Sequence, residues 1–451
     1  MGNWGGRVST WVRRGSQSLR GRDGTAAIAQ TLLARAFIIA VNVATGTITA
    51  RILGPSGRGE QAAMAIWPQF FAYSLSLGLP SALLYTLKRY PTDRSRTFSA
   101  AVVLGILVSV FSGIVGFIAI PILMHGKYGT EAIQLSQALM LAVPIVIFTE
   151  VLRSAMEASD EFAIANQIRF IPPLSTLGIL IFLALTQQLT PFTAVISYWL
   201  PMIPILVWMI ACARRFFVIR FTYLKKSFKR LLHYGLRAYG IDLISALAGQ
   251  IQQVLAVSLL VSESMGLYAI AFSLCQLLYV VQSSFVTVLF PKAAARPLSE
   301  VVEMTGRAAR ISGILAIVMA IVMMILAPVV LNLLYGAAYL PAIPIFRILA
   351  IETVLGGVAI MLSQAFMAID RPGIVTVIQG IGLVMGIPLI LMLTPIFGLL
   401  GLGLALLVST AIRLFSVWLC YPIILKTAPP GLWLTREDFD FMKQRIFKKF
   451  T

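Results

Sequence analysis

Charged residues are scarce in this chain. Asp, Glu, Lys and Arg make up 12% of its 451 residues, and only 17 of them are acidic. Soluble domains carry about 25% charged residues. Because 59% of the residues are hydrophobic, a water-soluble fold would expose large apolar patches and aggregate. The composition therefore excludes a soluble protein and indicates a membrane protein.

Residues that bind metals or form disulfides are also few. The chain has three cysteines, Cys212, Cys275 and Cys420, and two histidines, His125 and His233, all far apart. Zinc sites and disulfide frameworks need such residues at close, paired spacings. No G-x-x-x-x-G-K-[ST] phosphate loop and no G-x-S-x-G or H-E-x-x-H motif is present. We therefore expect no catalytic residue, no metal and no cofactor.

Long apolar runs fill most of the sequence. A membrane-spanning helix needs about 20 apolar residues, and the runs predict an all-α polytopic membrane protein of about twelve transmembrane helices. Their predicted ranges are 26–50, 61–87, 97–123, 132–157, 162–186, 191–216, 232–261, 266–290, 306–334, 341–368, 372–395 and 398–425.

The net charge of +19 is distributed in short basic segments between the apolar runs. With the N-terminus in the cytoplasm, only Arg51, Arg58 and Lys127 fall in loops on the opposite side. This asymmetry predicts that both termini are cytoplasmic, and it leaves no surface for nucleic acid. The predicted organisation is a basic N-terminus (1–25), a six-helix bundle (26–216), a basic linker (217–231), a second six-helix bundle (232–425) and an amphipathic tail (426–451).

The two halves of the sequence resemble each other at an offset of about 207 positions. KYGTEAIQLSQALMLAVPIV, from Lys127, aligns with LYGAAYLPAIPIFRILAIET, from Leu334. The same offset pairs Gly59 with Gly266 and Gln69 with Gln276. Six helices separate equivalent points, so the halves are predicted to be parallel repeats. Carriers built from such repeats bind their substrate between the halves near the membrane midplane.

Six arginines fall inside the predicted helices, where each costs about 2.5–3.5 kcal/mol at the helix centre unless it is paired or hydrated. They are Arg35, Arg153, Arg169, Arg237, Arg347 and Arg413. Glu150 lies three residues before Arg153, a spacing that favours an ion pair. Arg347 and Glu352 are five apart, which is poorer geometry. Both pairs are interpreted as ion pairs or gating contacts.

Arg35 and Asp242 occupy equivalent positions of the two repeats. We expect them to face each other across a central cavity, either as a pair that opens during transport or as a static salt bridge. Arg35, Arg169 and Arg237 together would make the cavity positive, which suits a diphosphate. Gln69, Gln250, Gln253 and Gln276 would hydrogen-bond sugar hydroxyls, or would join helices to one another.

The segment ARILGPSGRGEQAAMAIWPQFFAYSLSLGLPSALLY, from Ala50 to Tyr85, resembles the first helices of bacterial polysaccharide flippases of the Wzx type. The segments LLHYGLRAYGIDLISAL, MGLYAIAFSLCQLL, FPKAA and LYGAAYLPAIPIFRILA are similar to that family's helices seven to ten. These flippases belong to the multidrug/oligosaccharidyl-lipid/polysaccharide exporter superfamily.

The resemblance implies a V-shaped exporter in the bacterial inner membrane. It would flip undecaprenyl-diphosphate-linked oligosaccharide repeat units to the periplasmic leaflet, for exopolysaccharide or lipopolysaccharide assembly. A polysaccharide polymerase and a chain-length regulator are the partners that it suggests. Two alternatives stay open: a drug or metabolite/cation antiporter of the same fold, and a membrane enzyme of polysaccharide assembly.

Overall fold

The protein is helical throughout its described part. The computed structural model describes residues 24–161, 164, 171–220, 224–293 and 296–431. Within these ranges no residue belongs to a β-strand. A bilayer requires this, because a helix satisfies its backbone hydrogen bonds internally where no water is available. The all-α polytopic fold predicted from the sequence is confirmed.

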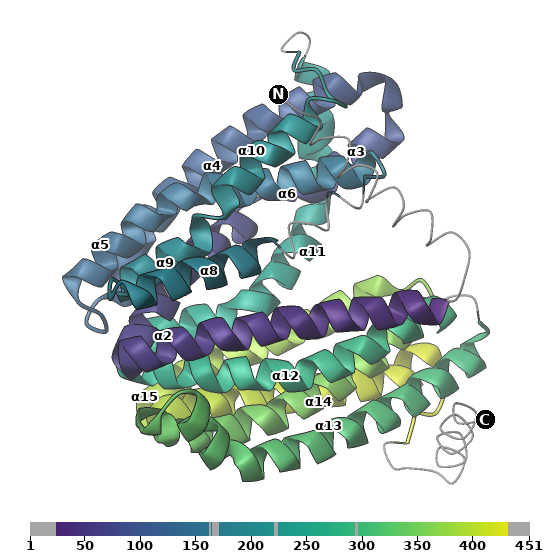
Figure 1. Cartoon of the computed structure of the whole chain (residues 1–451). Coiled ribbons are helices and arrows are strands. Elements are labelled where there is room, and N and C mark those ends of the chain that lie inside the picture. Colours follow the sequence, from purple (N-terminus) through teal and green to yellow (C-terminus); the bar gives the residue numbers. More distant parts are fainter. Residues whose placement is uncertain (1–23, 162–163, 165–170, 221–223, 294–295, 432–451) are drawn as a thin grey trace.

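The helices follow the predicted order along the chain (Figure 1). Their bounds are α2 Gly24–Ser74, α3 Leu79–Arg89, η1 Pro91–Asp93, α4 Arg94–Met124, α5 Thr130–Ala138, η2 Leu139–Ala142, α6 Val143–Ala158, α8 Ile171–Leu185, α9 Pro191–Trp199, α10 Met202–Ala213, α11 Leu224–Leu259, α12 Ser262–Ala293, α13 Leu298–Leu334, η3 Ala337–Ala342, α14 Ile343–Ala368, α15 Pro372–Cys420 and η4 Tyr421–Leu425.

Eight stretches of the described chain are long and apolar enough to cross a membrane. Two of them lie in the longest helices, α2 and α15, and each of these two helices is broken at a glycine. Gly54 has φ 67° and Gly398 has φ 58°, a left-handed conformation that glycine adopts without steric cost. Each break divides its helix near the boundary predicted between two spans. The protein is therefore a multi-pass membrane protein.

Several predicted helices are interrupted inside the membrane region. The second predicted helix, 61–87, is one element in the prediction but ends at Ser74 and resumes at Leu79. Leu77 and Gly78 both have positive φ there. Pro144 stands in the first turn of α6 and Pro201 immediately before α10. Proline lacks an N–H, so the first turn of a helix accommodates it best.

The helices form two groups that diverge like the arms of a V (Figure 1). Helices α3 to α10 form one arm, and α12 to α15 form the other. The described chain begins and ends at the open end, at Gly24 and Gly431. The arms meet at the opposite end.

The first helix of each predicted half crosses between the arms. The stretch of α2 before Gly54 lies alongside α12 (Figure 1), whereas Trp67, after the break, donates a hydrogen bond to the sulfur of Met124 in α4. In α11, Tyr234 stacks on Tyr85 of α3, with ring centroids 4.1 Å apart. Further along, α11 contacts α15. The division into bundles 26–216 and 232–425 stays a prediction.

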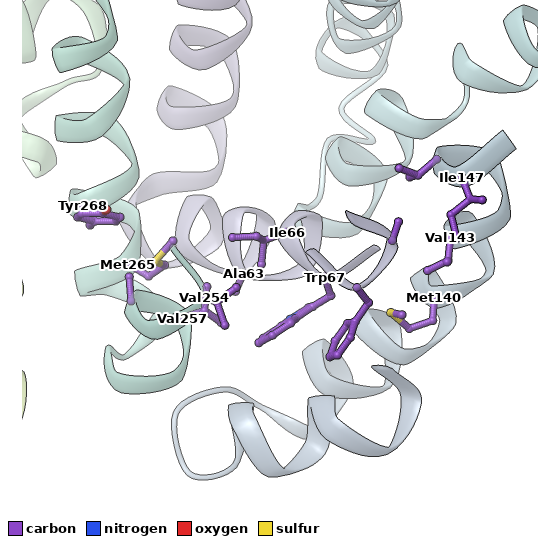
Figure 2. Packing of buried hydrophobic residues seen from close by; sticks show 14 of the residues in the cluster. Ala63, Ile66, Trp67, Met140, Val143, Ile147, Val254, Val257, Met265 and Tyr268 are labelled. Carbon is purple, nitrogen blue, oxygen red and sulfur yellow. The ribbon is translucent and has the colours of Figure 1, made fainter. Parts of the chain in front are cut away.

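Apolar side chains fill the region where α2, α11 and α12 approach one another. Figure 2 shows Ala63 and Ile66 of α2 together with Val254 and Val257 of α11 and Met265 of α12. All five are buried, and they belong to one continuous cluster that extends into both arms. This packing fixes the relative positions of the helices that carry the candidate site.

Candidate functional site

The arms touch through two glycines that the sequence repeat pairs with each other. A Cβ atom added at Gly59 would overlap the carbonyl oxygen of Ser262 and would lie 2.9 Å from the nitrogen of Gly266. A Cβ added at Gly266 would overlap the carbonyl oxygen of Pro55 and would lie 3.1 Å from the nitrogen of Gly59. The contact is reciprocal, as a two-fold relation between the repeats requires.

Hydrogen bonds reinforce this contact, which we call the junction: residues Ala50–Gly59 against Ser262–Gly266 and Leu333–Tyr339. The guanidinium of Arg51 donates to the carbonyl oxygens of Leu333 and Leu334, in the latter case over 2.9 Å. The hydroxyl of Tyr339 donates to the carbonyl oxygen of Ala50 over 3.2 Å. The hydroxyls of Ser56 and Ser262 are 3.0 Å apart. The junction closes one end of the V.

A cavity of about 410 Å³ lies between the arms, next to the junction. It is lined by α2 after the break, α9, α11 and α12. Its polar lining residues are Arg58, Gln61, Gln69, Tyr198, Gln250, Gln253, Tyr268 and Ser273. Gln61 and Tyr268 are each 1% exposed, whereas Gln69 and Ser273 are exposed. The cavity is therefore deepest near the junction and opens away from it.

Several buried polar atoms of the lining have no hydrogen-bond partner among the described residues. They are the Nε of Arg58, the Nε2 of Gln61, the Oε1 of Gln250 and the hydroxyl of Tyr268. One internal bond is formed, from Nη1 of Arg58 to Oε1 of Gln61 over 2.6 Å. Leaving such groups unpaired costs about 1–3 kcal/mol each. Each of these atoms is also closed off from the cavity, so a ligand reaches it only if the side chains of the lining move.

The structure brings together three of the four predicted glutamines. Gln69, Gln250 and Gln253 line the cavity. Gln276, one turn beyond Phe272 and Ser273 in α12, is exposed and is not among the described residues that line the cavity. Gln69 and Gln276 thus occupy equivalent positions of the two repeats, but only Gln69 is among the described residues that line the cavity.

Arg58 was missed as a lining residue, because its position before the second predicted helix assigned it to a loop. In the structure it lies within α2, after the Gly54 break. Gln61 and Tyr268 were also missed. The signal for all three is helical spacing, since 58, 61, 65 and 69 share one face, as do 265, 268 and 272.

Four predicted cavity residues lie outside what the structure describes. Arg169 is in a range without a described backbone, and the side chains of Arg35, Arg237 and Asp242 are not described. The pairing of Arg35 with Asp242 therefore stays a prediction.

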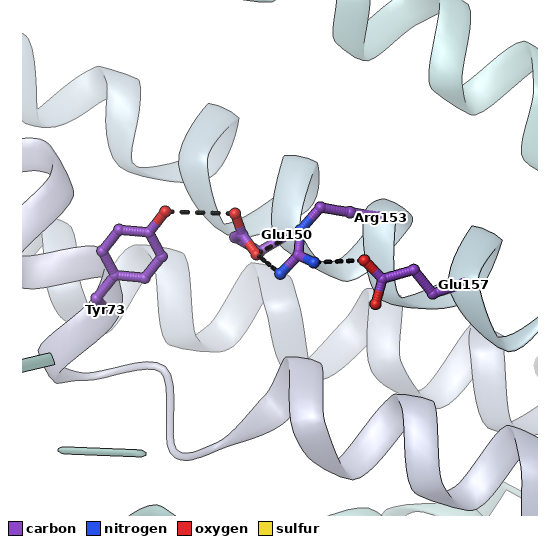
Figure 3. A network of polar contacts seen from close by, with 4 residues as sticks. All are labelled: Tyr73, Glu150, Arg153 and Glu157. Atoms are coloured by element: carbon purple, nitrogen blue, oxygen red, sulfur yellow. Dashed lines mark hydrogen bonds and ion pairs between the residues drawn. The ribbon is translucent and has the colours of Figure 1, made fainter. Parts of the chain in front are cut away.

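A polar network lies in the first arm (Figure 3). The Nε of Arg153 donates a hydrogen bond to Glu150 over 3.0 Å, and its Nη1 donates to Glu157. The hydroxyl of Tyr73 donates to Glu150 over 3.3 Å. The three charged side chains are at most 30% exposed. Because Arg153 already has two carboxylate partners, this network is a structural tie between α2 and α6.

The other predicted pair does not form. Arg347 is exposed and makes no ion pair with a described residue, because residues five apart point to different sides of a helix. Glu352 instead accepts a hydrogen bond of 2.6 Å from the hydroxyl of Thr410 in α15. Arg413, one turn further along α15, also approaches Glu352. A Cβ atom added at Gly356 would lie 3.2 Å from the Nη2 of Arg413 and 3.8 Å from the Oε1 of Glu352.

The fold matches known flippases and transporters. The lipid II flippase MurJ in an inward closed conformation aligns with a TM-score of 0.74 at 15% identity, covering 88% of this chain and 87% of that one. An inward-facing multidrug resistance MATE family transporter of the MOP superfamily gives 0.68 at 16% identity, covering 86% and 94%. A MOP superfamily transporter from Pyrococcus furiosus gives 0.60 at 17% identity, covering 91% and 97%.

No curated protein sequence matches the chain significantly. The family model described as "Polysaccharide biosynthesis protein" matches residues 48–344. This range contains the junction, the cavity and the Glu150–Arg153 network, and it spans most of the chain. The fold is that of MOP superfamily flippases and transporters. Because the family model matches most of the chain, the chain belongs to the polysaccharide biosynthesis protein family.

Proposed function

We propose that the protein flips undecaprenyl-diphosphate-linked oligosaccharide repeat units from the cytoplasmic to the periplasmic leaflet by alternating access, for exopolysaccharide or lipopolysaccharide assembly. The observation that carries this proposal is the cavity between the arms, whose accessible lining is polar and includes Gln69, Tyr198, Gln253 and Ser273. Such a lining suits a polar cargo carried between two halves of a transporter. The described residues include no cluster of metal ligands beside it.

The orientation in the bacterial inner membrane is proposed from charge. The starts of α4 and α11 form a basic groove with Arg96, Lys225, Lys226 and Lys229. This groove lies at the open end of the V, where the described chain also begins and ends. Since cytoplasmic segments carry the excess of Lys and Arg, the open end faces the cytoplasm and both termini are cytoplasmic. The structure would then be an inward-open state with the junction closed toward the periplasm.

Arg35, Arg169 and Arg237 are proposed to bind the diphosphate, because guanidinium groups bind phosphate oxygens bidentately. Asp242 would pair with Arg35 when the diphosphate is absent. A polysaccharide polymerase and a chain-length regulator would receive the product on the periplasmic side.

The test is translocation of a fluorescent undecaprenyl-diphosphate oligosaccharide in proteoliposomes. Ala65→Trp places a bulky indole in the cavity and should slow flipping by about 10-fold or more, as overfilling a packed site does. Val329→Trp adds the same group on the exposed apolar surface of α13 and should flip normally. Arg35→Ala and Asp242→Ala test the proposed pair. Exchange of drug cations for protons without lipid flipping would replace the flippase by the antiporter.

A further inference from the structure

The basic groove at the starts of α4 and α11 carries positive charge that no described residue balances. Its volume is about 480 Å³, and it is lined by Asp93, Arg96, Lys225, Lys226, Ser227 and Lys229. The three lysines are exposed and form no ion pair with a described residue. The carboxylate of Asp93 already binds Arg230 over 2.9 Å and approaches Arg96 to 3.7 Å. The groove is therefore ready to receive an anion from outside the chain.

The segment Arg214–Arg220, which joins α10 toward α11, lies against the start of α4 beside the basic groove. Phe217 stacks on Phe98 with ring centroids 4.6 Å apart and an interplanar angle of 16°. The N–H of Val218 donates to the hydroxyl of Ser95 over 3.3 Å. Ser95 is the immediate neighbour in α4 of the arginine that lines the groove. The segment and the groove therefore adjoin on the first turn of α4.

This segment holds apolar side chains at the surface between cations. Phe216, Val218 and Ile219 are 41%, 59% and 50% exposed, and the arginines at both ends of the segment are exposed as well. Exposed apolar groups next to Lys and Arg are typical of a segment that lies in the interface of an anionic bilayer. A soluble anion would balance the cations and leave the apolar side chains in water. A phospholipid covers both.

We propose that the basic groove binds the headgroup of an anionic phospholipid of the cytoplasmic leaflet, while the acyl chains of that lipid pack on the segment Arg214–Arg220. Lys225, Lys226 and Lys229 meet the phosphate, which an ammonium group binds as a point charge. From the groove, α11 runs on to contact α15 of the second arm. The lipid therefore secures the first-arm end of a helix that joins the arms. The inference rests on the proposed orientation and is independent of the cargo.

The test titrates the purified protein in detergent with dioleoyl phosphatidylglycerol or with dioleoyl phosphatidylcholine, and measures bound lipid by native mass spectrometry. The wild type should bind one phosphatidylglycerol more tightly than any phosphatidylcholine. Replacing the three lysines by glutamine should weaken that lipid about 5-fold for each lysine and about 100-fold for all three. Because the lysines are exposed, thermal stability should stay unchanged. Asp93→Asn should act in the opposite direction and tighten the lipid about 5-fold, since it removes the negative charge of the lining.

The matched control removes three exposed cations from the second arm. Arg296, Arg371 and Lys426 follow α12, α14 and η4, and their replacement by glutamine gives the same net charge as the lysine variant. This control should bind phosphatidylglycerol as the wild type does. Equal weakening by both triple variants would overturn the site, because binding would then follow net charge alone.

Two further outcomes would also overturn the proposal. One is equal affinity of the wild type for the two phospholipids. The other is displacement of phosphatidylglycerol by undecaprenyl phosphate at an equal or lower concentration, which would assign the groove to the carrier lipid instead. None of these outcomes depends on flipping, so the proposed function is tested separately.

Discussion

The glycine contact at the junction makes the sharpest prediction. In Gly266→Ala, the new methyl group overlaps the carbonyl oxygen of Pro55. The neighbouring atoms are backbone on both helices, so no side chain can rotate away. Overpacking of this kind costs about 1–3 kcal/mol. The cost falls only on the state in which the arms touch, so the equilibrium should shift about 5- to 150-fold toward an open junction.

The shift is measurable as a distance between spin labels across the junction. Gln187, in the turn before α9, and Ala338, in η3, are exposed on opposite arms. Both lie near the junction, since a Cβ at Gly57 would lie 3.4 Å from Pro191 at the start of α9, and Tyr339 of η3 donates to Ala50. The native cysteines leave little background once Cys420 is replaced by serine, because Cys212 and Cys275 are buried. Gly266→Ala should raise the population with the longer distance.

Two comparisons decide the matter. Because the contact is reciprocal, Gly59→Ala should shift the distance as Gly266→Ala does, and the double variant should add less than the sum, since one separation relieves both overlaps. Gly178→Ala, in α8, meets no heavy atom within 4 Å and should leave the distances unchanged. An unaltered distance distribution in Gly266→Ala, with lowered thermal stability, would refute the reasoning, because the overlap would then be absorbed within one state.

The other predictions concern charged side chains. Arg51→Met keeps the aliphatic stem but loses the bonds to the α13 carbonyls, and should open the junction by about 2- to 10-fold on the same distance measurement; an unchanged distribution would contradict the role of this residue. Arg153→Met leaves two carboxylates without their cation and should cost about 1–3 kcal/mol in thermal unfolding. Adding Glu150→Gln should recover part of this loss, and a further decrease instead would show that Arg153 does not act through the pair.

Most of the fold could be predicted from the sequence because membrane helices are set by length and apolar content. The twelve predicted ranges correspond to the described helices once the breaks at Gly54 and Gly398 are counted, except that most of 162–170 lies outside the described residues. The interruption at Leu77 and Gly78 was not predicted. It requires a positive φ at Leu77. Tertiary packing imposes that conformation, and the hydrophobic periodicity of the sequence does not predict it.

The candidate site was predicted less completely. Gln69, Gln250 and Gln253 are predicted to line the cavity because their amides could hydrogen-bond sugar hydroxyls, with contacts between helices as the alternative. Arg58 is not, because a shift of a few residues in the predicted start of a helix turned a lining residue into a loop residue. Whether Glu352 meets Arg347 or Thr410 depends on which helix packs against α14. This depends on a tertiary contact, which cannot be predicted from the spacing of residues along one helix.

The junction and the cavity are built on the same two helices, and this couples them. Gly59 directly follows Arg58 in α2, and Gly266 stands two residues before Tyr268 in α12. A cargo bound in the cavity against both helices would therefore tie together the segments that must separate when the junction opens. A ligand shifts an equilibrium only through its differential affinity for the two states, and the effect is reciprocal. In the proposed function, a variant that opens the junction should weaken cargo binding by the same factor by which the bound cargo opposes opening. Opening would then release the cargo on the far side.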